Sequence, residues 1–156
     1  MKLNTRHDIE VPIAFVWQYL TDFRQFELLA ARRGAHIEHR GSHDGLQEGR
    51  GWQLEFRFRG KLRKALVTLT GLEPRERLDF GIDSPSLAGG ARLELLALSA
   101  NRTRLSLVSD VKPRTLAARL VIQTLRLAKG RTQRKYDSIG EKLARQITEN
   151  WRSSGR

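Results

Sequence analysis

A long amphipathic pattern in the last third of the chain restricts the fold more than any other feature. Apolar or small residues recur every three or four positions after Pro113, which predicts one helix of about thirty residues. A helix with one apolar face is stable only when that face is covered, so the preceding chain must supply a matching apolar surface. The stripe consists of Val121, Leu125, Ala128, Thr132, Tyr136, Ile139, Leu143 and Ile147.

Residues 35 to 111 predict that surface as five or six antiparallel strands separated by turns. In the clearest strand, large apolar residues alternate with polar ones from Trp52 to Phe58, so one face of the strand must be covered. Residues 84–90, rich in small side chains, are expected to form a loop that could act as a lid. We expect a shared concave face made of Trp52, Leu54, Phe56, Phe58, Leu105, Leu107 and Val111 from the strands and Leu125, Tyr136, Ile139 and Leu143 from the helix.

The N-terminal segment predicts a strand followed by two short helices. Residues 2–10 alternate, with Leu3, Thr5, His7 and Ile9 on one face. Pro12 then opens a helix, because the first helical turn does not need its missing N–H. The predicted fold class is α+β: a curved antiparallel sheet of about seven strands that grips a long C-terminal helix, with two short helices after strand 1. We expect one domain over residues 1–148 and a flexible tail over 149–156.

Composition limits the classes of protein to consider. The 156 residues are 39% hydrophobic, enough for one core, and no stretch of eighteen apolar residues occurs, so we expect a soluble protein. The N-terminus lacks the pattern of a secretory signal and the chain has no cysteine, so we expect a cytoplasmic location. The lack of cysteine also excludes a disulfide framework, a thiolate nucleophile and a cysteine zinc site.

The order of elements, with Ile9-Glu10-Val11-Pro12 leading into Val16-Trp17 and Leu20-Thr21-Asp22, resembles the START-like (helix-grip, SRPBCC) superfamily. It is most similar to the polyketide cyclase/dehydrase and lipid-transport branch, and the resemblance extends from Leu3 to about Ile147. It implies a seven-stranded sheet around the C-terminal helix and a cavity for lipids, polyketides, quinones or other apolar ligands. The segment 23–29 departs from the coenzyme Q-binding members, since it lacks their Tyr-x-x-Phe-Leu-Pro pattern.

Candidate ligand-binding residues follow from the predicted faces: Trp52, Leu54, Phe56, Phe58, Leu116, Leu120, Tyr136 and His7. Leu116 and Leu120, with Leu127, form a second apolar strip nearly opposite the first, which suggests a cavity mouth, a covering loop or a partner. Each choice has a plainer alternative. The aromatic row of the strand could be ordinary core, the Tyr136 hydroxyl could bond to backbone, and His7 could be satisfied by a neighbouring hydroxyl or carbonyl.

Neither a metal, a cofactor nor a catalytic group is predicted. His36, His39 and His43 lie close in sequence, but residues 36 and 39 of a strand point to opposite faces, which disfavours a metal site. The chain has no Gly-x-Ser-x-Gly motif for a serine nucleophile. A polyketide cyclase or dehydratase would need at least two convergent ionisable groups in the cavity, and the sequence shows no such pair.

Charge is concentrated at the C-terminal end. Residues 112–156 contain 12 Lys and Arg against 3 Asp and Glu, a net +9 out of +12 for the chain. Such a helix face is usually a solvated surface, but its strong bias also suits an anionic partner, and an anionic membrane surface is one candidate. Nucleic acid is disfavoured because Tyr136 is the one aromatic residue between Lys112 and Arg145. The sequence thus predicts binding or transport of a hydrophobic small molecule; the alternatives are a polyketide cyclase/dehydratase-like enzyme and a basic module for ribosome, RNA or membrane.

Overall fold

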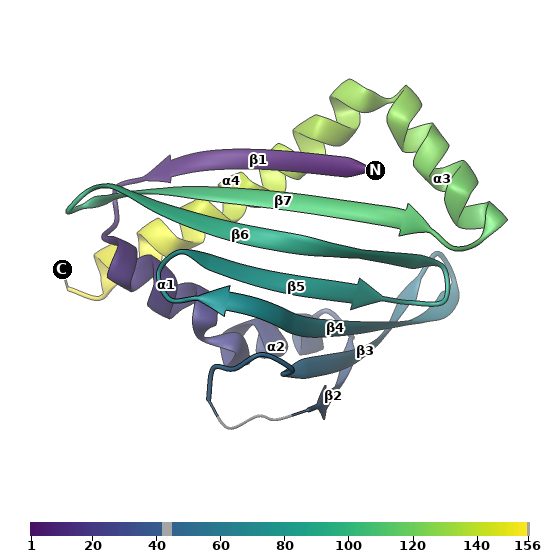
Figure 1. Cartoon of the computed structure of the whole chain (residues 1–156), viewed down its shortest axis with the longest axis horizontal. Helices are drawn as coiled ribbons and strands as arrows, with labels where there is room; N and C mark the ends of the chain where they lie inside the picture. The colour runs from purple at the N-terminus through teal and green to yellow at the C-terminus, as the bar shows by residue number, and fades with distance from the viewer. Residues whose placement is uncertain (42–44, 156) are drawn as a thin grey trace.

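A computed structural model describes residues 1–41 and 45–155. Seven strands form one antiparallel sheet, and four helices accompany it (Figure 1). The strands are β1 (Lys2–Ile9), β2 (His36–Arg40), β3 (Gly51–Phe58), β4 (Lys61–Glu73), β5 (Arg77–Asp83), β6 (Leu87–Ser99) and β7 (Arg102–Pro113). The helices are α1 (Ile13–Thr21), α2 (Phe23–Arg32), α3 (Leu116–Leu127) and α4 (Lys129–Ser153). The predicted α+β class is confirmed.

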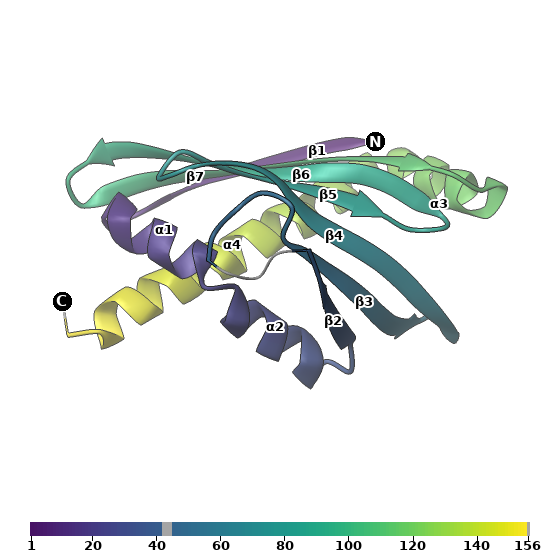
Figure 2. The ribbon, with the colours of Figure 1, turned by 60° about the horizontal axis from the view of Figure 1, so that its bottom comes forward.

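The strand order β1-β7-β6-β5-β4-β3-β2 places the first strand beside the last one. Helices α1, α2 and α4 lie on one side of the curved sheet, and α3 extends beyond its edge (Figure 2). No helix in the described part of the chain is both long enough and apolar enough to cross a membrane.

The covered face of the sheet follows from the register of the strands. Trp52 of β3 pairs with Val67 of β4, which pairs with Ile82 of β5, and residues opposite one another in an antiparallel ladder share a face. Trp52, Leu54 and Val67 all line the covered face, as the alternation predicts, but burial along β3 follows distance from the helices more than alternation, since Gln53 and Glu55 are half-buried like Leu54 and Phe56. At the end of this strand, however, Phe58 is 55% exposed, so the apolar row extends past the helices that cover it.

Three contacts hold the layers together. The buried hydroxyl of Thr103 donates to the carbonyl oxygen of Val11 at 2.7 Å, which fixes the connection between β1 and α1. The hydroxyls of Ser109 on β7 and Tyr136 on α4 lie 2.6 Å apart. Gly140 brings α4 against β1 where no larger residue would fit. These contacts keep α4 across the β1–β7 side of the sheet.

The prediction of one uninterrupted C-terminal helix is wrong. Ala128 has φ −98° and ψ 43°, outside the helical region, so the chain turns between α3 and α4. The turn takes Leu125 out of the expected contact with the sheet, and its side chain is 39% exposed. Ile139 is 58% exposed for a different reason, because the buried line of the continuous helix α4 passes through Gly140 instead. Ile122, off the predicted stripe, is the α3 residue that is buried, at 4%.

Two further boundaries differ from the prediction. Helix α4 continues to Ser153, and the ring of Trp151 packs edge-on against Phe15 with centroids 5.1 Å apart, so the flexible tail is wrong for residues 149–153. The predicted loop 84–90 is mostly strand, because β6 begins at Leu87. The hydroxyl of Ser84 accepts from the Leu87 N–H and donates to its carbonyl, which closes a tight turn there.

Candidate functional site

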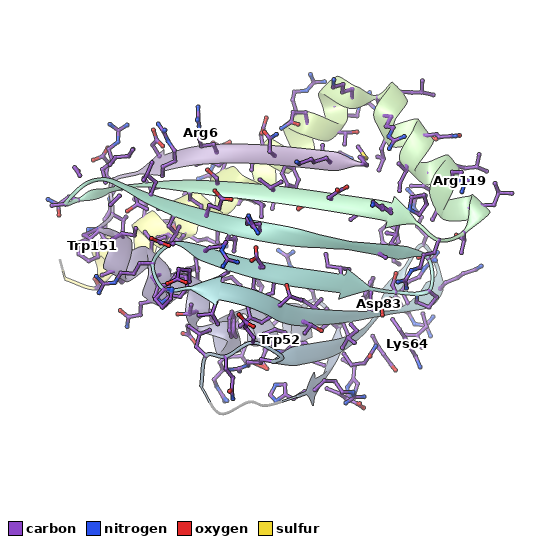
Figure 3. All side chains as sticks on the ribbon, in the orientation of Figure 1. Arg6, Trp52, Lys64, Asp83, Arg119 and Trp151 are labelled. Atoms are coloured by element: carbon purple, nitrogen blue, oxygen red, sulfur yellow. The ribbon has the colours of Figure 1, made fainter. Side chains whose placement is uncertain are left out.

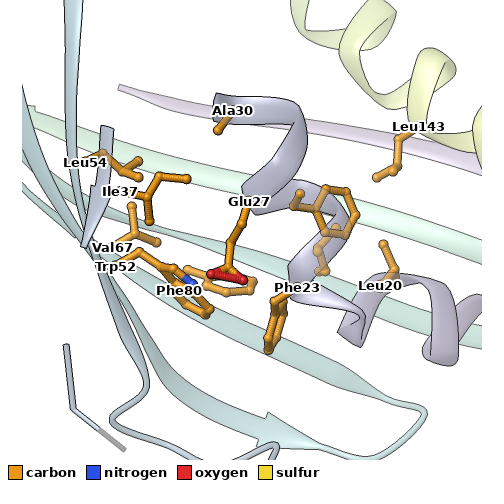
Figure 4. A pocket seen from close by; sticks show the side chains of 12 residues that line it. Leu20, Phe23, Glu27, Ala30, Ile37, Trp52, Leu54, Val67, Phe80 and Leu143 are labelled. Carbon is orange, nitrogen blue, oxygen red and sulfur yellow. The ribbon is translucent and has the colours of Figure 1, made fainter. Parts of the chain in front are cut away.

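An apolar pocket of about 300 Å³ lies between the sheet and the helices (Figure 4). Helix α2 forms one wall, strands β2 to β6 form the other, and Leu20 of α1 and Leu143 of α4 complete the lining. The volume is at the lower end of the range for small-molecule sites. The lining consists of Leu20, Phe23, Phe26, Glu27, Ala30, Ile37, Trp52, Leu54, Val67, Phe80, Leu93 and Leu143.

Aromatic rings form the floor of the pocket. Phe23 of α2 packs edge-on against Trp52 of β3, with centroids 5.1 Å apart, and against Phe80 of β5 at 6.2 Å. The guanidinium of Arg50 lies over the Phe23 and Trp52 rings at 5.2 and 5.5 Å, close enough for cation–π attraction. Phe23 and Trp52 are 6% and 7% exposed, so this cluster is rigid core as well as pocket floor.

Glu27 is the one ionisable side chain among the lining residues. It projects from α2 toward the rings of the floor (Figure 4) and pairs with the imidazole Nε2 of His39 on β2. The Glu27 side chain is 18% exposed, whereas that of His39 is 51% exposed. The pair therefore has one member, Glu27, in the pocket lining and the other, His39, at the protein surface.

Two of the four predicted strand residues lie on the pocket wall and two lie outside it. Trp52 and Leu54 are on the pocket wall. Phe56 and Phe58 share their sheet face but lie beyond the lining, with Phe56 half-buried and Phe58 exposed. That Trp52 and Leu54 contact a ligand stays a prediction.

The predicted helix residues lie away from the pocket. Leu116 and Leu120, on α3, are 71% and 55% exposed and do not line it. The hydroxyl of Tyr136 meets Ser109 under α4, outside the lining. Burial raises the pKa of the Tyr136 phenol, and the bond to Ser109 opposes that shift. The structure thus gives Tyr136 a clear packing role between α4 and β7.

His7 belongs to a polar cluster between β1 and α4. Its Nε2 is 2.9 Å from the hydroxyl of Thr5, in agreement with the plainer alternative of a histidine satisfied by its neighbour. Asp137 completes the cluster, and hydrogen bonds from Thr5 and Gln133 lower the pKa of its carboxyl group, with a smaller contribution from the charge of His7. None of these residues lines the apolar pocket.

The sequence analysis missed four important lining residues: Phe23, Phe26, Glu27 and Phe80. Phe23, Phe26 and Ala30 follow helical spacing, and Glu27 interrupts the same stripe. A charged residue on the apolar face of a helix was the available signal that the face borders a cavity. No comparable signal distinguishes Phe80 from ordinary core, because its place in the lining depends on how α2 packs against the sheet.

Within residues 1–41 and 45–155, no group of three His, Asp or Glu side chains converges as a metal site would require. His36 lies 3.6 Å from Glu38, whereas His39 pairs with Glu27. These two histidines thus have different carboxylate partners. His43 lies outside the described residues.

Comparisons with solved structures identify the fold. The Zhui aromatase/cyclase from Streptomyces sp. R1128 superimposes with a TM-score of 0.66 at 15% identity, covering 100% of this chain and 96% of that one. A conserved protein from Geobacillus kaustophilus gives 0.66 at 13%, with 96% of each chain covered. A START superfamily protein from Mycobacterium smegmatis gives 0.54 at 15%, covering 85% of this chain and 95% of that one.

No family model matches the sequence, and a sequence search of curated proteins finds no match. At the identities of the structural matches, the likeness shows the fold alone. The chain has the START-like helix-grip fold that its order of elements predicts.

Proposed function

We propose that this protein binds a hydrophobic small molecule in the pocket between α2 and the sheet, and transports the molecule while it is bound there. The observation that supports the proposal most directly is the chemistry of the lining: eleven of the twelve residues have apolar or aromatic side chains, and Glu27 is the exception. When an apolar ligand is buried there, each Å² of apolar surface removed from water stabilises the complex by about 25 cal/mol. The modest volume favours a compact ligand over a long-chain lipid.

The comparisons support the same class of ligand. The fold is shared with a START superfamily protein and with the Zhui aromatase/cyclase. An enzyme of that type is the first alternative for this chain. Binding is favoured over catalysis because Glu27 is the single ionisable group among the lining residues. The alternative of a basic interaction module concerns another surface, since the lining contains no Lys or Arg.

Filling the pocket provides the test. Ala30 faces the pocket from α2, and its neighbour Ala31 is exposed on the same helix. Ala30→Phe places a ring in the cavity, whereas Ala31→Phe places the same ring in solvent. Titration with the neutral fluorescent probe phenylnaphthylamine should show a loss of affinity of at least about tenfold for Ala30→Phe, which corresponds to about 1.4 kcal/mol.

The matched variant Ala31→Phe should bind the probe as the unaltered chain does. Equal affinity in all three proteins would place the probe elsewhere and remove the support for the pocket. Circular dichroism and thermal unfolding of both variants distinguish a filled pocket from a disrupted fold. Native mass spectrometry of the purified protein would then identify any apolar ligand that copurifies.

A further inference from the structure

One end of the molecule has exposed apolar side chains on two elements that are distant in sequence. In this antiparallel sheet β3 and β7 run in the same direction, so the β3–β4 turn and the start of α3 lie at the same end of the strands. Both views show this arrangement (Figures 1 and 2). We call residues 57–64 the hairpin tip.

The apolar strip of α3 faces away from the rest of the protein. Leu116, Leu120 and Leu127 are 71%, 55% and 90% exposed, and their spacing of four and seven residues places them along one line of the helix. Ile122, on the other side of the helix, is 4% exposed and packs against the protein. Burial of Ile122 holds the helix in an orientation that presents the three leucines to solvent.

The hairpin tip also has exposed apolar side chains. Phe58 and Leu62 are 55% and 57% exposed. They project from opposite faces of the hairpin, because Phe58 pairs with Lys61 and Leu62 pairs with Arg57, so both faces of its tip present an apolar side chain. The guanidinium of Arg59 lies 5.3 Å from the centroid of the Phe58 ring. Between Phe56 and Leu72 the sequence contains five Lys and Arg and no Asp or Glu: Arg57, Arg59, Lys61, Arg63 and Lys64.

Positive charge surrounds the α3 strip as well. The sequence has no Asp or Glu from Val111 to Tyr136, and Arg119 and Arg126 flank the exposed leucines. Asp83 lies at this end but pairs with Arg114. Figure 3 shows Lys64, Asp83 and Arg119 at one end of the molecule, with Trp151 at the other. The two apolar patches therefore share a basic border.

We propose that α3 and the hairpin tip together dock on the surface of a bilayer that contains anionic phospholipid. Exposed aliphatic side chains bordered by Lys and Arg are the pattern of interfacial membrane binding, in which the leucines enter the headgroup boundary and the cations contact lipid phosphates. The geometry supplies two contact points at one end of the molecule. The sheet face that contains the apolar pocket extends to that end through Phe56 and Phe58.

Charge complementarity selects this partner over two others. A second copy of the chain, joined symmetrically through the same surface, would oppose Arg119 and Arg126 to like charges. A nucleic acid would use the cations but not the exposed Leu116, Leu120 and Leu127, and among aromatic residues the surface offers Phe58 alone. An anionic bilayer satisfies both the charge and the apolar surface.

Vesicle cosedimentation tests the proposal with phosphatidylcholine vesicles, with and without phosphatidylglycerol. The unaltered chain should bind the mixed vesicles at least about tenfold more tightly, and high salt should reduce the difference. The double variant Leu116→Ser with Leu120→Ser, and the double variant Phe58→Ser with Leu62→Ser, should each weaken binding to the mixed vesicles by about tenfold or more. Arg119→Glu with Arg126→Glu should abolish the preference for anionic lipid.

Matched controls change the same residue types elsewhere. Leu96 and Leu98 are exposed at the opposite end of β6, and Lys142 and Arg152 are exposed on α4. Leu96→Ser with Leu98→Ser, and Lys142→Glu with Arg152→Glu, should retain vesicle binding within about twofold. Circular dichroism establishes that every variant is folded.

Four results would overturn the proposal. These are equal binding to neutral and anionic vesicles, losses in the control variants as large as those in the α3 and hairpin variants, binding of RNA but not of vesicles, and a stable dimer in solution that buries the three leucines. Because the assay reports membrane binding, its result does not depend on whether the pocket holds a ligand.

Discussion

Gly140 of α4 lies so close to His7 of β1 that a Cβ on the glycine would be 2.6 Å from the imidazole Nε2. The same Cβ would be 2.8 Å from the methyl carbon of Thr5. Both distances are shorter than van der Waals contact, so only glycine permits this approach. The contact sets how deeply α4 sits on the sheet, and through Leu143 it sets the position of one wall of the pocket.

Gly140→Ala should therefore destabilise the protein despite its higher helix propensity. Overpacking costs about 1–3 kcal/mol, whereas alanine in a helix interior gains about 1 kcal/mol over glycine. Gly130→Ala is the matched control on the same helix, because its Cβ would meet only the movable end of Arg134 at 3.4 Å. Urea unfolding should show a net loss for Gly140→Ala and none for Gly130→Ala; equal free energies of unfolding for the two variants would contradict the close contact.

Tyr136→Phe should lower stability without changing ligand affinity. The substitution removes the 2.6 Å bond to Ser109 and leaves the serine hydroxyl without that partner, at a cost of about 1 kcal/mol. The free energy of unfolding and the affinity for phenylnaphthylamine measure the two effects separately. Combining Tyr136→Phe with Ser109→Ala should cost less than the sum of the single changes. Weaker probe binding at unchanged stability would instead make Tyr136 a ligand contact, as the sequence analysis predicts.

Glu27 should select against anionic ligands. Its carboxyl group lies in an apolar lining, where repulsion between like charges is weakly screened. Glu27→Gln should tighten binding of anilinonaphthalene sulfonate by about three- to tenfold, relative to the neutral phenylnaphthylamine. His39→Gln removes the imidazole partner of Glu27. It should weaken binding of anilinonaphthalene sulfonate relative to phenylnaphthylamine. Equal changes for both probes would show that the Glu27 charge does not act on the ligand.

Much of the fold was predictable because sheet and helix periodicities each fix a buried face. The alternation in β1 and β3 assigned Thr5, Ile9 and Trp52 correctly to the covered side. The break at Ala128 was not predictable in the same way. Ala128 itself is neither Gly nor Pro, Gly130 two residues later is the one local signal, and the apolar spacing continues through the break. The second strip at Leu116 and Leu120 was the sign that this segment differs, since one helix cannot bury two opposite faces against one sheet.

The pocket was harder to predict than the fold because its lining comes from three helices (α1, α2 and α4) and from strands β2 to β6. Trp52 and Leu54 could be chosen from one alternating strand. Phe23 and Phe80 could not, because their contribution depends on how α2 packs on the sheet, where the two rings meet. Tyr136 and His7 were chosen from periodicity alone; Tyr136 contacts Ser109 of β7 and His7 of β1 faces α4, and neither lines the pocket.

The position of a bound apolar molecule tests the central claim most directly. Methyl-labelled protein saturated with phenylnaphthylamine can be examined by nuclear Overhauser spectroscopy, which reports protons within about 5 Å, the scale of side-chain contact. If the probe occupies the pocket, it should show contacts to the methyl groups of the lining residues Ile37, Leu54, Val67, Leu93 and Leu143. Contacts to Leu116 and Leu120 on α3, with none to the five pocket residues, would contradict the central claim.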